Sequence, residues 1–269
     1  MDVYYLGPEG TFSHQIAKKY FDETYNLIPV ANFKNIAEKI KENNALAILP
    51  VENSISSNVH QNIDIILQNN LKIIGEVYCR IEFSLVGIKN SKLSDIKKAF
   101  AHPMAVLQTK KFIEKNNFEI LEASSNVDAQ IKLAKENLSD FAAISTNILF
   151  DPSLKILQSN IADYKNNQTR FSIVTSEADL YSYPATKLSV LFTTQHQPGA
   201  LLNVLETLAV NKFNLSKIES RPIPETEFEY MFWIDVELGG KSTIEFEQIF
   251  KNKVSSYKLI GAYKKGKLY

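Results

Sequence analysis

Short apolar runs alternate with amphipathic stretches along the first two thirds of the chain. Residues 45–51 are continuously apolar, which is typical of a strand buried on both faces of a sheet. After Asn32, a residue type that caps helices, Phe33, Ile36, Ala37 and Ile40 recur at the spacing of one helix face. The same reasoning predicts strands at residues 3–6, 26–30, 45–51, 72–78, 81–87, 119–123, 141–144 and 171–174, and helices at 11–20, 59–67, 103–115 and 126–136.

This alternation of strands and helices predicts an α/β fold with mainly parallel sheets. The length of the segment favours two lobes with a cleft between them, connected near residues 76–87 and again near 161–167. Ligands of such sheets bind beyond the carboxyl ends of the strands. The polar residues that follow the strands ending at Leu6 and Val51 are therefore the first places to look for a site.

The rhythm changes after a looser connection at residues 176–186. Leu201, Val204, Leu205 and Leu208 form the apolar side of a helix in this last part of the chain. The order β-α-β-β-α-β predicts a separate ferredoxin-like module. Its predicted elements are strand 188–193, helix 200–210, strands 215–220 and 229–237, helix 243–251 and strand 257–262.

Composition narrows the function classes. At 269 residues, two domains are the natural expectation. The formal net charge is zero, with 30 basic and 30 acidic residues, so the chain has no electrostatic footprint for nucleic acid or an anionic membrane. No apolar run approaches the ~20 residues that span a bilayer, and the first strand follows no signal-type segment. The single Cys79 forms no internal disulfide, and we expect a cytoplasmic protein.

Arginine is rare in this chain. Only Arg80, Arg170 and Arg221 occur among the 30 basic residues, and the others are lysine. The planar guanidinium is preferred where a carboxylate is bound through two hydrogen bonds, so these positions are candidates for anion contacts. Lysine-biased codon usage explains the same pattern equally well.

Two places carry candidate chemistry for an anionic ligand. Thr169 and Arg170 stand at the mouth of the strand at 171–174, although the β-branch of threonine by itself also favours a strand. Thr11 and Ser13 begin a helix after a glycine turn, and helix starts bind carboxylates through backbone N–H groups. Plain capping of the helix accounts for Thr11 and Ser13 equally well.

Four segments together resemble the prephenate dehydratases, enzymes that convert prephenate into phenylpyruvate on the route to phenylalanine. They are Tyr5-Leu6-Gly7-Pro8-Glu9-Gly10-Thr11-Phe12-Ser13, Leu49-Pro50-Val51-Glu52-Asn53-Ser54, Ala101-His102-Pro103 through Gln108, and Asn167-Gln168-Thr169-Arg170-Phe171. The last third resembles the ACT regulatory domain of the same family through Gly199-Ala200-Leu201-Leu202 and Glu219-Ser220-Arg221-Pro222. These motifs stand in the family's order and cover nearly the whole chain.

The resemblance implies a two-lobed, periplasmic-binding-protein-like catalytic domain at residues 1–176, followed by a ferredoxin-like ACT domain. Lobe 1 is expected at about 1–77 and 164–176, lobe 2 at about 78–163, a linker at 177–186 and the ACT domain at 187–269. It also implies prephenate as the substrate, phenylalanine as the effector, no metal or other cofactor, and a homodimer or homotetramer. The expected catalytic residues are Thr169, Glu52 and Asn53; the substrate-binding residues are Thr11, Ser13, Ser54, Gln108, Arg170 and Phe171; the effector-binding residues are Gly199, Ala200, Leu201, Leu202, Glu219, Ser220, Arg221 and Pro222.

Most of these roles have a structural alternative. We expect Thr169 to donate a hydrogen bond to the departing hydroxyl of the substrate. Asn53 and Ser54 either donate to the substrate or cap the helix at 59–67. Arg170 either clamps the pyruvyl carboxylate or pairs with an acid and holds the strand mouth. Glu52 is either bonded to the scaffold or protonated beside the leaving oxygen, because an ionised carboxylate would repel a dianion.

Three positions depart from the family's pattern. Ser57 stands where a glycine is usual, and serine adds strain there if the backbone needs a positive φ. Phe83 stands in the place of a histidine, so no role of that histidine carries over. Met104 replaces a glutamine after His102, which is itself equally well a satisfied structural histidine.

Three functions remain open at this stage. The first is prephenate dehydratase with feedback by phenylalanine, and the second is arogenate dehydratase, which acts on the aminated analogue. The third is a two-lobed binding protein joined to an amino-acid sensor and without chemistry of its own. The ACT-like module either binds phenylalanine or only pairs two chains.

Overall fold

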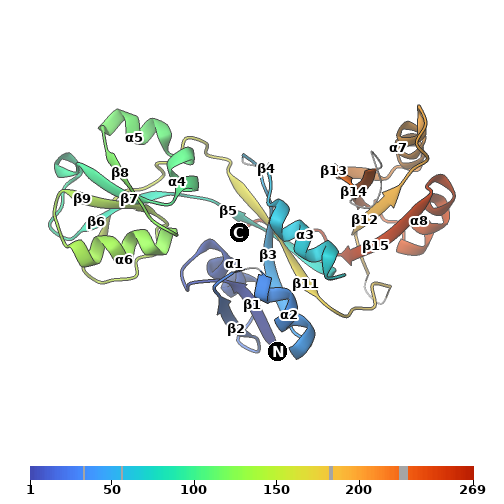
Figure 1. The fold of residues 1–269 in the computed structure, drawn as a ribbon, viewed down its shortest axis with the longest axis horizontal. Coiled ribbons are helices and arrows are strands. Elements are labelled where there is room, and N and C mark those ends of the chain that lie inside the picture. The colour runs from blue at the N-terminus through green and yellow to red at the C-terminus, as the bar shows by residue number, and fades with distance from the viewer. Residues whose placement is uncertain (33, 56, 182–183, 224–229) are drawn as a thin grey trace.

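In the computed structural model, which describes residues 1–32, 34–55, 57–181, 184–223 and 230–269, two β-sheets organise the chain (Figure 1). We call residues 1–80 with 168–175 lobe 1, residues 84–158 lobe 2, and residues 187–263 the C-terminal module. Lobe 1 lies between the other two parts (Figure 1). No helix among the described residues is long and apolar enough to cross a membrane. Phe33 and Glu229, which the sequence places in a helix and a strand, lie outside the described residues.

Lobe 1 contributes the strand order β5-β11-β3-β1-β2 to a ten-stranded sheet, with β4 beside β3. Helix α1 packs against one face through Ile16 and Ala17, while α2 and α3 cover the opposite face. This division follows from the alternation in β1, where Val3 and Tyr5 face α1 and Tyr4 faces the other side. The elements of lobe 1 are β1 Asp2–Leu6, α1 Phe12–Tyr20, β2 Asn26–Val30, α2 Lys34–Asn43, β3 Leu46–Asn53, β4 Ser57–Asn58, α3 His60–Gln68, β5 Lys72–Arg80 and β11 Gln168–Thr175.

Lobe 2 is a five-stranded sheet with the order β10-β6-β9-β7-β8. Helix α6 buries Val127, Ala129 and Leu133. The elements are β6 Ser84–Ile88, the 3₁₀ turn η1 Leu93–Asp95, β7 Lys98–Ala101, α4 Pro103–Gln108, α5 Lys110–Asn116, β8 Glu119–Glu122, α6 Asn126–Glu136, β9 Phe141–Ser145 and β10 Leu154–Gln158.

The C-terminal module has the antiparallel order β13-β14-β12-β15, which is the ferredoxin-like arrangement that the sequence predicts. Its core is aromatic, with Phe192, Phe246 and Phe250 fully buried and in ring contact. The elements are β12 Lys187–Thr193, α7 Ala200–Val210, β13 Asn214–Pro222, β14 Tyr230–Glu237, α8 Thr243–Phe250, the 3₁₀ turn η2 Lys251–Lys253 and β15 Ser256–Tyr263.

The structure corrects four expectations about these elements. The sheets are mixed rather than mainly parallel, because β11 runs antiparallel to both β3 and β5, and β6 antiparallel to β9 and β10. Strands β7 and β10 are absent from the prediction. The helix expected at 103–115 divides at Thr109, whose side chain bonds back to the Ala105 carbonyl. The strand expected at 45–51 continues through Glu52 to Asn53.

The C-terminal module is not separate from lobe 1, contrary to the expectation. Gly261 of β15 pairs in parallel with Ile73 of β5, which makes one continuous sheet. A Cβ atom at Gly261 would lie only 2.8 Å from the Ile73 Cβ, so the absence of a side chain lets the two strands meet.

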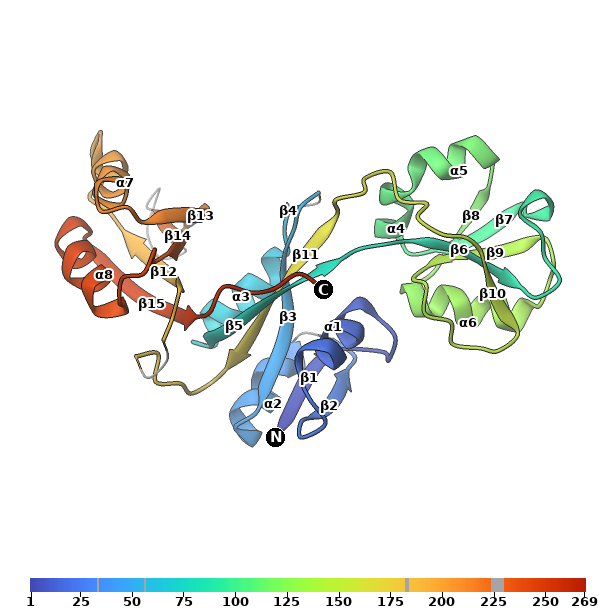
Figure 2. The same cartoon turned by 180° about the vertical axis from the view of Figure 1, so that it is seen from behind.

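Residues 264–269 return from β15 and lie along β5 (Figure 2). Tyr78 N–H donates to the Lys267 carbonyl at 2.9 Å, and Tyr269 N–H donates to the Tyr78 carbonyl at 2.8 Å. Within this segment Gly266 N–H donates to Glu76 Oε1 at 3.1 Å. The segment therefore covers the edge of β5 close to where the chain crosses into lobe 2.

We expect the substitution Gly266→Ala to lower the free energy of unfolding by about 1–3 kcal/mol, as overpacking of a filled site does. A Cβ at Gly266 would lie 2.3 Å from the Glu76 carbonyl oxygen, which belongs to the backbone and has no rotamer to change. Thermal and urea unfolding measure the loss. Lys264→Ala, an exposed change in the same segment, is the control and should stay within ~0.5 kcal/mol of the unsubstituted chain. Equal midpoints for the two variants would contradict the packing seen at Gly266.

Candidate active site

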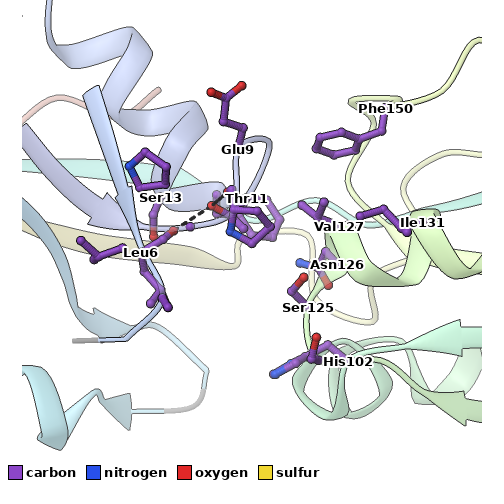
Figure 3. Close-up of a pocket in the computed structure, with 17 residues that line it drawn as sticks. Leu6, Glu9, Thr11, Ser13, His102, Ser125, Asn126, Val127, Ile131 and Phe150 are labelled. Atoms are coloured by element: carbon purple, nitrogen blue, oxygen red, sulfur yellow. Dashed lines mark hydrogen bonds between the residues drawn. The ribbon is translucent and has the colours of Figure 1, made fainter. Parts of the chain in front are cut away.

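A cavity of 930 Å³ lies between lobe 1 and lobe 2 (Figure 3). The turn between β1 and α1 forms its lobe 1 side, and His102, Ser125, Asn126 and Phe150 belong to its lobe 2 side. Helices α1, α4 and α6 all begin at this cavity. Helix starts carry unpaired backbone N–H groups and a partial positive charge, so the cavity suits an anion of small-molecule size.

Thr11 and Ser13 both line the cavity, as the sequence predicts. The Thr11 hydroxyl lies 3.0 Å from the carbonyl oxygens of Leu6 and Pro8, to which it donates, and it accepts from His14 N–H at 3.4 Å. Thr11 is therefore the cap of α1, and its hydrogen is already shared between two carbonyls. The Ser13 hydroxyl bonds to no described residue and remains available to a ligand.

His102 and Ser125 cap the two lobe 2 helices at the cavity. His102 Nδ1 accepts from Met104 N–H at 3.2 Å, and burial lowers the pKa of His102, which favours this neutral acceptor form. The Ser125 hydroxyl accepts from Asp128 N–H at 3.0 Å. The neighbouring Asn126 Oδ1 is buried and has no hydrogen-bond partner among the described residues. His102 is thus a structural histidine placed in the wall of the cavity.

Four polar side chains form a second feature, which we call the amide–hydroxyl cluster: Asn53, Gln108, Asn167 and Thr169. Asn53 Nδ2 donates to Thr169 Oγ1 at 3.0 Å and to Asn167 Oδ1 at 2.8 Å. Asn167 Nδ2 donates to Gln108 Oε1 at 2.5 Å. All four are buried, and they join the end of β3, the start of β11 and the end of α4. The cluster therefore links lobe 1 to lobe 2.

Thr169 is not one of the residues that line the cavity, although we expected it to face the cleft. It lies at the same carboxyl edge of the lobe 1 sheet as the β1–α1 turn, two strands away, which is about 10 Å across the sheet. Helix α4 joins the two features, because His102 at its start lines the cavity and Gln108 at its end belongs to the cluster. Among the described residues, the Thr169 hydroxyl accepts from Asn53 and donates to none.

Ser54 holds the two strands together beside the cluster. Its hydroxyl accepts from Gln168 N–H at 3.0 Å, and its own N–H donates to the Gln168 carbonyl at 2.9 Å. Neither Asn53 nor Ser54 caps α3, whose first turn follows Val59 without a side-chain cap. The structure thus shows Ser54 neither as a donor to substrate nor as the cap of α3. Ser54 instead bonds the end of β3 to Gln168, where the chain returns from lobe 2.

The structure corrects the role expected for Arg170. Its guanidinium is buried and pairs with Glu52 at 3.0 Å, Glu76 at 3.3 Å and Asp235 at 2.5 Å. Burial opposes the charge, but the three carboxylates outweigh it and raise the pKa of Arg170 well above its ordinary value. Arg170 does not line the cavity, and its charge is met by three protein carboxylates. The alternative, an arginine that pairs with acids at the strand mouth, is correct, and Glu52 is its partner from the site.

Phe171 likewise does not line the cavity. Its side chain is 2 % exposed and lies in the core of lobe 1 with Tyr5 and Val77. Phe83 is also buried and meets the Phe12 ring edge-on, so it fills core space instead of entering the cavity. Ser57 belongs to the extended strand β4, which has no need of a positive φ. Met104 is partly exposed on α4.

The residues expected to bind an effector lie in two places of the C-terminal module. Gly199 caps α7 with φ +82°, and Ala200, Leu201 and Leu202 form the first turn of that helix. Glu219, Ser220, Arg221 and Pro222 end the edge strand β13. No described contact joins the two places within one chain.

Part of the β13 motif instead faces lobe 1 of the same chain. Arg221 pairs with Asp64 of α3, and Glu219 Oε1 lies 3.4 Å from His60 Nδ1. Within the chain, the charge of Arg221 is therefore met by Asp64.

Three buried charged residues next to Arg170 or its partners were not among the candidates from the sequence: Glu76, Lys187 and Asp235. Lys187 Nζ donates to Glu76 Oε2 at 2.9 Å, and both residues meet at the junction of lobe 1 and the C-terminal module. Glu76 and Asp235 each interrupt a run of apolar residues, and that signal was available in the sequence, whereas Lys187 is the first residue of β12. Phe150 of the cavity carried no comparable signal.

Comparison with known proteins gives a consistent result. The family model for prephenate dehydratase matches residues 3–179. The curated prephenate dehydratase of Methanocaldococcus jannaschii is 32 % identical over 268 residues, which cover 97 % of this chain and 97 % of that protein. Among solved structures, the prephenate dehydratase of Staphylococcus aureus subsp. aureus Mu50 is similar with a TM-score of 0.85 and 29 % identity, over 98 % of this chain and 100 % of that chain. The prephenate dehydratase of Arthrobacter aurescens in complex with L-Phe is similar with a TM-score of 0.84 and 28 % identity, over 98 % and 90 % of the two chains.

We expect Asn167→Ala to destabilise the chain by about 1–3 kcal/mol, because it removes one of the hydrogen bonds of the Asn53 amide and leaves the buried Gln108 side-chain carbonyl without its Asn167 donor. Urea unfolding measures the loss. The neighbouring Asn166 is exposed and engages Ser54 only through its backbone carbonyl, so Asn166→Ala is the matched control and should cost less than ~0.5 kcal/mol. If both alanine variants unfold at the same urea concentration, the cluster does not bind the lobes together.

Proposed function

The chain belongs to the prephenate dehydratase family, and from this premise we propose that its amide–hydroxyl cluster and its interlobe cavity together carry out the decarboxylating dehydration of prephenate to phenylpyruvate. The chain is therefore a carbon–oxygen lyase of phenylalanine biosynthesis. The observation that carries the proposal is the bond from Asn53 Nδ2 to Thr169 Oγ1, which leaves the hydroxyl hydrogen free to donate.

The reaction sets simple demands on the site. The bond between the ring and its carboxylate breaks and releases CO2, its electron pair completes the aromatic ring, and the opposite hydroxyl leaves as hydroxide. The hydroxide takes up one proton and becomes water, so the prephenate dianion and one proton give the phenylpyruvate anion, CO2 and water. The protein has to hold a dianion, assist the leaving hydroxyl, and let the ring carboxylate depart.

Thr169 is the residue we assign to the leaving hydroxyl. A threonine hydroxyl is a weak acid, so it acts as a positioned hydrogen-bond donor and relays the proton that the hydroxide needs. Asn53 occupies a lone pair of Thr169 Oγ1 and thereby turns its hydrogen away from the amide. Gln108 and Asn167 complete the cluster from the lobe 2 side.

The carboxylates of the substrate are best held at the helix starts of the cavity. Ser13 offers a free hydroxyl there, and the first N–H groups of α1 and α6 add neutral donors. Neutral donors suit the ring carboxylate, because a full cation at that group would oppose its loss as CO2. The pairing of Arg170 with three protein carboxylates agrees with this requirement.

For the C-terminal module we propose an ACT domain that binds L-phenylalanine and pairs with a second copy of the chain in a homodimer or homotetramer. The prephenate dehydratase of Arthrobacter aurescens binds L-Phe, which supports the effector. Gly199 and Ser220 lie on separate elements, and β13 is the edge strand of its sheet, so side-by-side pairing of two modules would bring the motifs of two chains together. We keep the expectation of a cytoplasmic enzyme.

We expect the purified chain to convert prephenate to phenylpyruvate at neutral pH and Thr169→Ala to lower kcat by about 10²–10⁴-fold, since the leaving hydroxyl then lacks its donor. Phenylpyruvate is followed by its absorbance in alkali. Thr175→Ala is the matched control, because Thr175 is a buried threonine of the same strand that bonds only to the Ala45 carbonyl.

Full turnover by the Thr169→Ala variant would remove Thr169 from the mechanism. Parallel assays with arogenate decide the substrate, because a higher kcat/KM with arogenate than with prephenate would make the chain an arogenate dehydratase. Absence of turnover with either substrate would leave the fold without the proposed activity.

We expect L-phenylalanine to lower the rate of prephenate turnover through a coupling free energy of about 1–3 kcal/mol between the module and the cavity. The rate is measured over a range of phenylalanine concentrations, with tyrosine as the control ligand. An unchanged rate and KM at saturating phenylalanine would leave the module with a role in pairing chains only.

A further inference from the structure

The junction between lobe 1 and the C-terminal module contains a buried charge network with five members: Glu52, Glu76, Arg170, Lys187 and Asp235. All but Glu52 are buried, and Glu52 is the member that reaches solvent, with 38 % of its side chain exposed. The network holds three carboxylates and two cations. Its members come from β3, β5, β11, β12 and β14, so it fastens four strands around Arg170.

Asp235 of β14 is the residue of the C-terminal module that contacts Arg170 directly. Its Oδ2 lies 2.5 Å from Arg170 Nη1, while its Oδ1 accepts from Ser189 Oγ at 2.6 Å and Trp233 Nε1 at 2.9 Å. Burial by itself would raise the pKa of Asp235, but Arg170 and Lys187 outweigh it and hold that pKa below its ordinary value. Oδ1 of Asp235 thus bonds within the C-terminal module, and Oδ2 bonds to Arg170 of lobe 1.

Arg170 stands next to Thr169, beside an irregularity in the pairing of β11. The register between β11 and β3 shifts between Arg170 and Phe171, whereas β11 pairs with β5 in regular register from Gln168 to Ile173, so the irregularity lies on the side of β3, which carries Asn53. Arg170 Nε also pairs with Glu52, the residue before Asn53. The guanidinium therefore belongs to the neighbour in sequence of Thr169 and contacts Glu52, the neighbour in sequence of Asn53.

We propose that Asp235 is a positioning residue of the active site: it holds Arg170, and through Arg170 the end of β3 and the start of β11, so that Asn53 and Thr169 keep their hydrogen bond. The C-terminal module then forms part of the support of the catalytic hydroxyl. The inference rests on the proposed function for its effect on turnover, but its geometric content is independent of that function.

The variant Asp235→Asn tests the link to Arg170 selectively. An asparagine at this position keeps its carbonyl oxygen toward Ser189 and Trp233 and turns an NH2 group toward the guanidinium, where two donors repel each other. Ser189→Ala is the matched control, because it removes a donor from the opposite oxygen of the same carboxylate and leaves the Arg170 pair in place.

We expect Asp235→Asn to lower kcat by about tenfold or more with KM changed by less than about twofold, because a small displacement of a catalytic group costs turnover rather than affinity. Hydrogen–deuterium exchange in the peptide covering residues 166–175 should become faster in Asp235→Asn and stay unchanged in Ser189→Ala. An unchanged kcat and exchange rate in Asp235→Asn, or the same losses in Ser189→Ala, would overturn the proposal.

A variant that fails to fold does not end the test. Asp235→Glu keeps the negative charge and moves it by one methylene, so it should lower kcat while Ser189→Ala does not, and equal kcat values would overturn the proposal. If the unsubstituted chain does not turn over prephenate, the proposed function fails, whereas the exchange rates of residues 166–175 still decide whether Asp235 positions this segment.

Discussion

The guanidinium of Arg170 is the charge on which the junction between lobe 1 and the C-terminal module depends. A buried cation is stable only where carboxylates surround it, and loss of one partner of a buried pair typically costs about 3–5 kcal/mol. Asp235 of β14, Glu76 of β5 and Glu52 of β3 meet that need from three strands at once. The strand that carries Thr169 is thereby tied to β3, β5 and β14. We expect such a network to fix the relative positions of these strands rather than to raise the net free energy of unfolding.

The site itself divides the work between two kinds of polar groups. Backbone N–H groups at the starts of α1 and α6 lie at the cavity, whereas amide and hydroxyl side chains gather at the cluster around Thr169. Neither group contributes a free cation, since Arg170 is used by the scaffold. An anion is therefore met by dipoles, which bind it without neutralising the carboxylate that has to leave.

Much of the fold follows from apolar periodicity, and the failures have physical causes. The helices of the C-terminal module and its strand order could be predicted because each element has a clear apolar side, such as Val204 and Leu208 of α7. Strand β7 is only four residues long, too short to show a period. The antiparallel direction of β11 could not be read from its sequence, because a strand buried on both faces looks the same in either direction.

The sequence predicted which residues form the candidate site better than it predicted what each of them does. Thr169, Asn53 and Gln108 could be named from the sequence and do meet in one cluster. Arg170 and Phe171 share their motif with Thr169 but belong to the scaffold. Arg170 follows Thr169 directly and so points to the other face of the strand, where it meets protein carboxylates, and Phe171 is buried in the core of lobe 1. Which face belongs to the cleft depends on how lobe 1 meets the C-terminal module, and no local pattern encodes that.

The position of β11 between β3 and β5 also imposes an order on folding. Lobe 2 is continuous in sequence, so its strands need only contacts within residues 84–158. Lobe 1 stays incomplete until the chain has returned from lobe 2, because Thr169 pairs with Asn53 at a sequence separation of 116 residues. Contacts of such large separation form slowly, and until then β3 and β5 have no partner between them. During synthesis on the ribosome, lobe 2 can therefore fold before β11 has been made, and the part of the site that belongs to lobe 1 forms only afterwards.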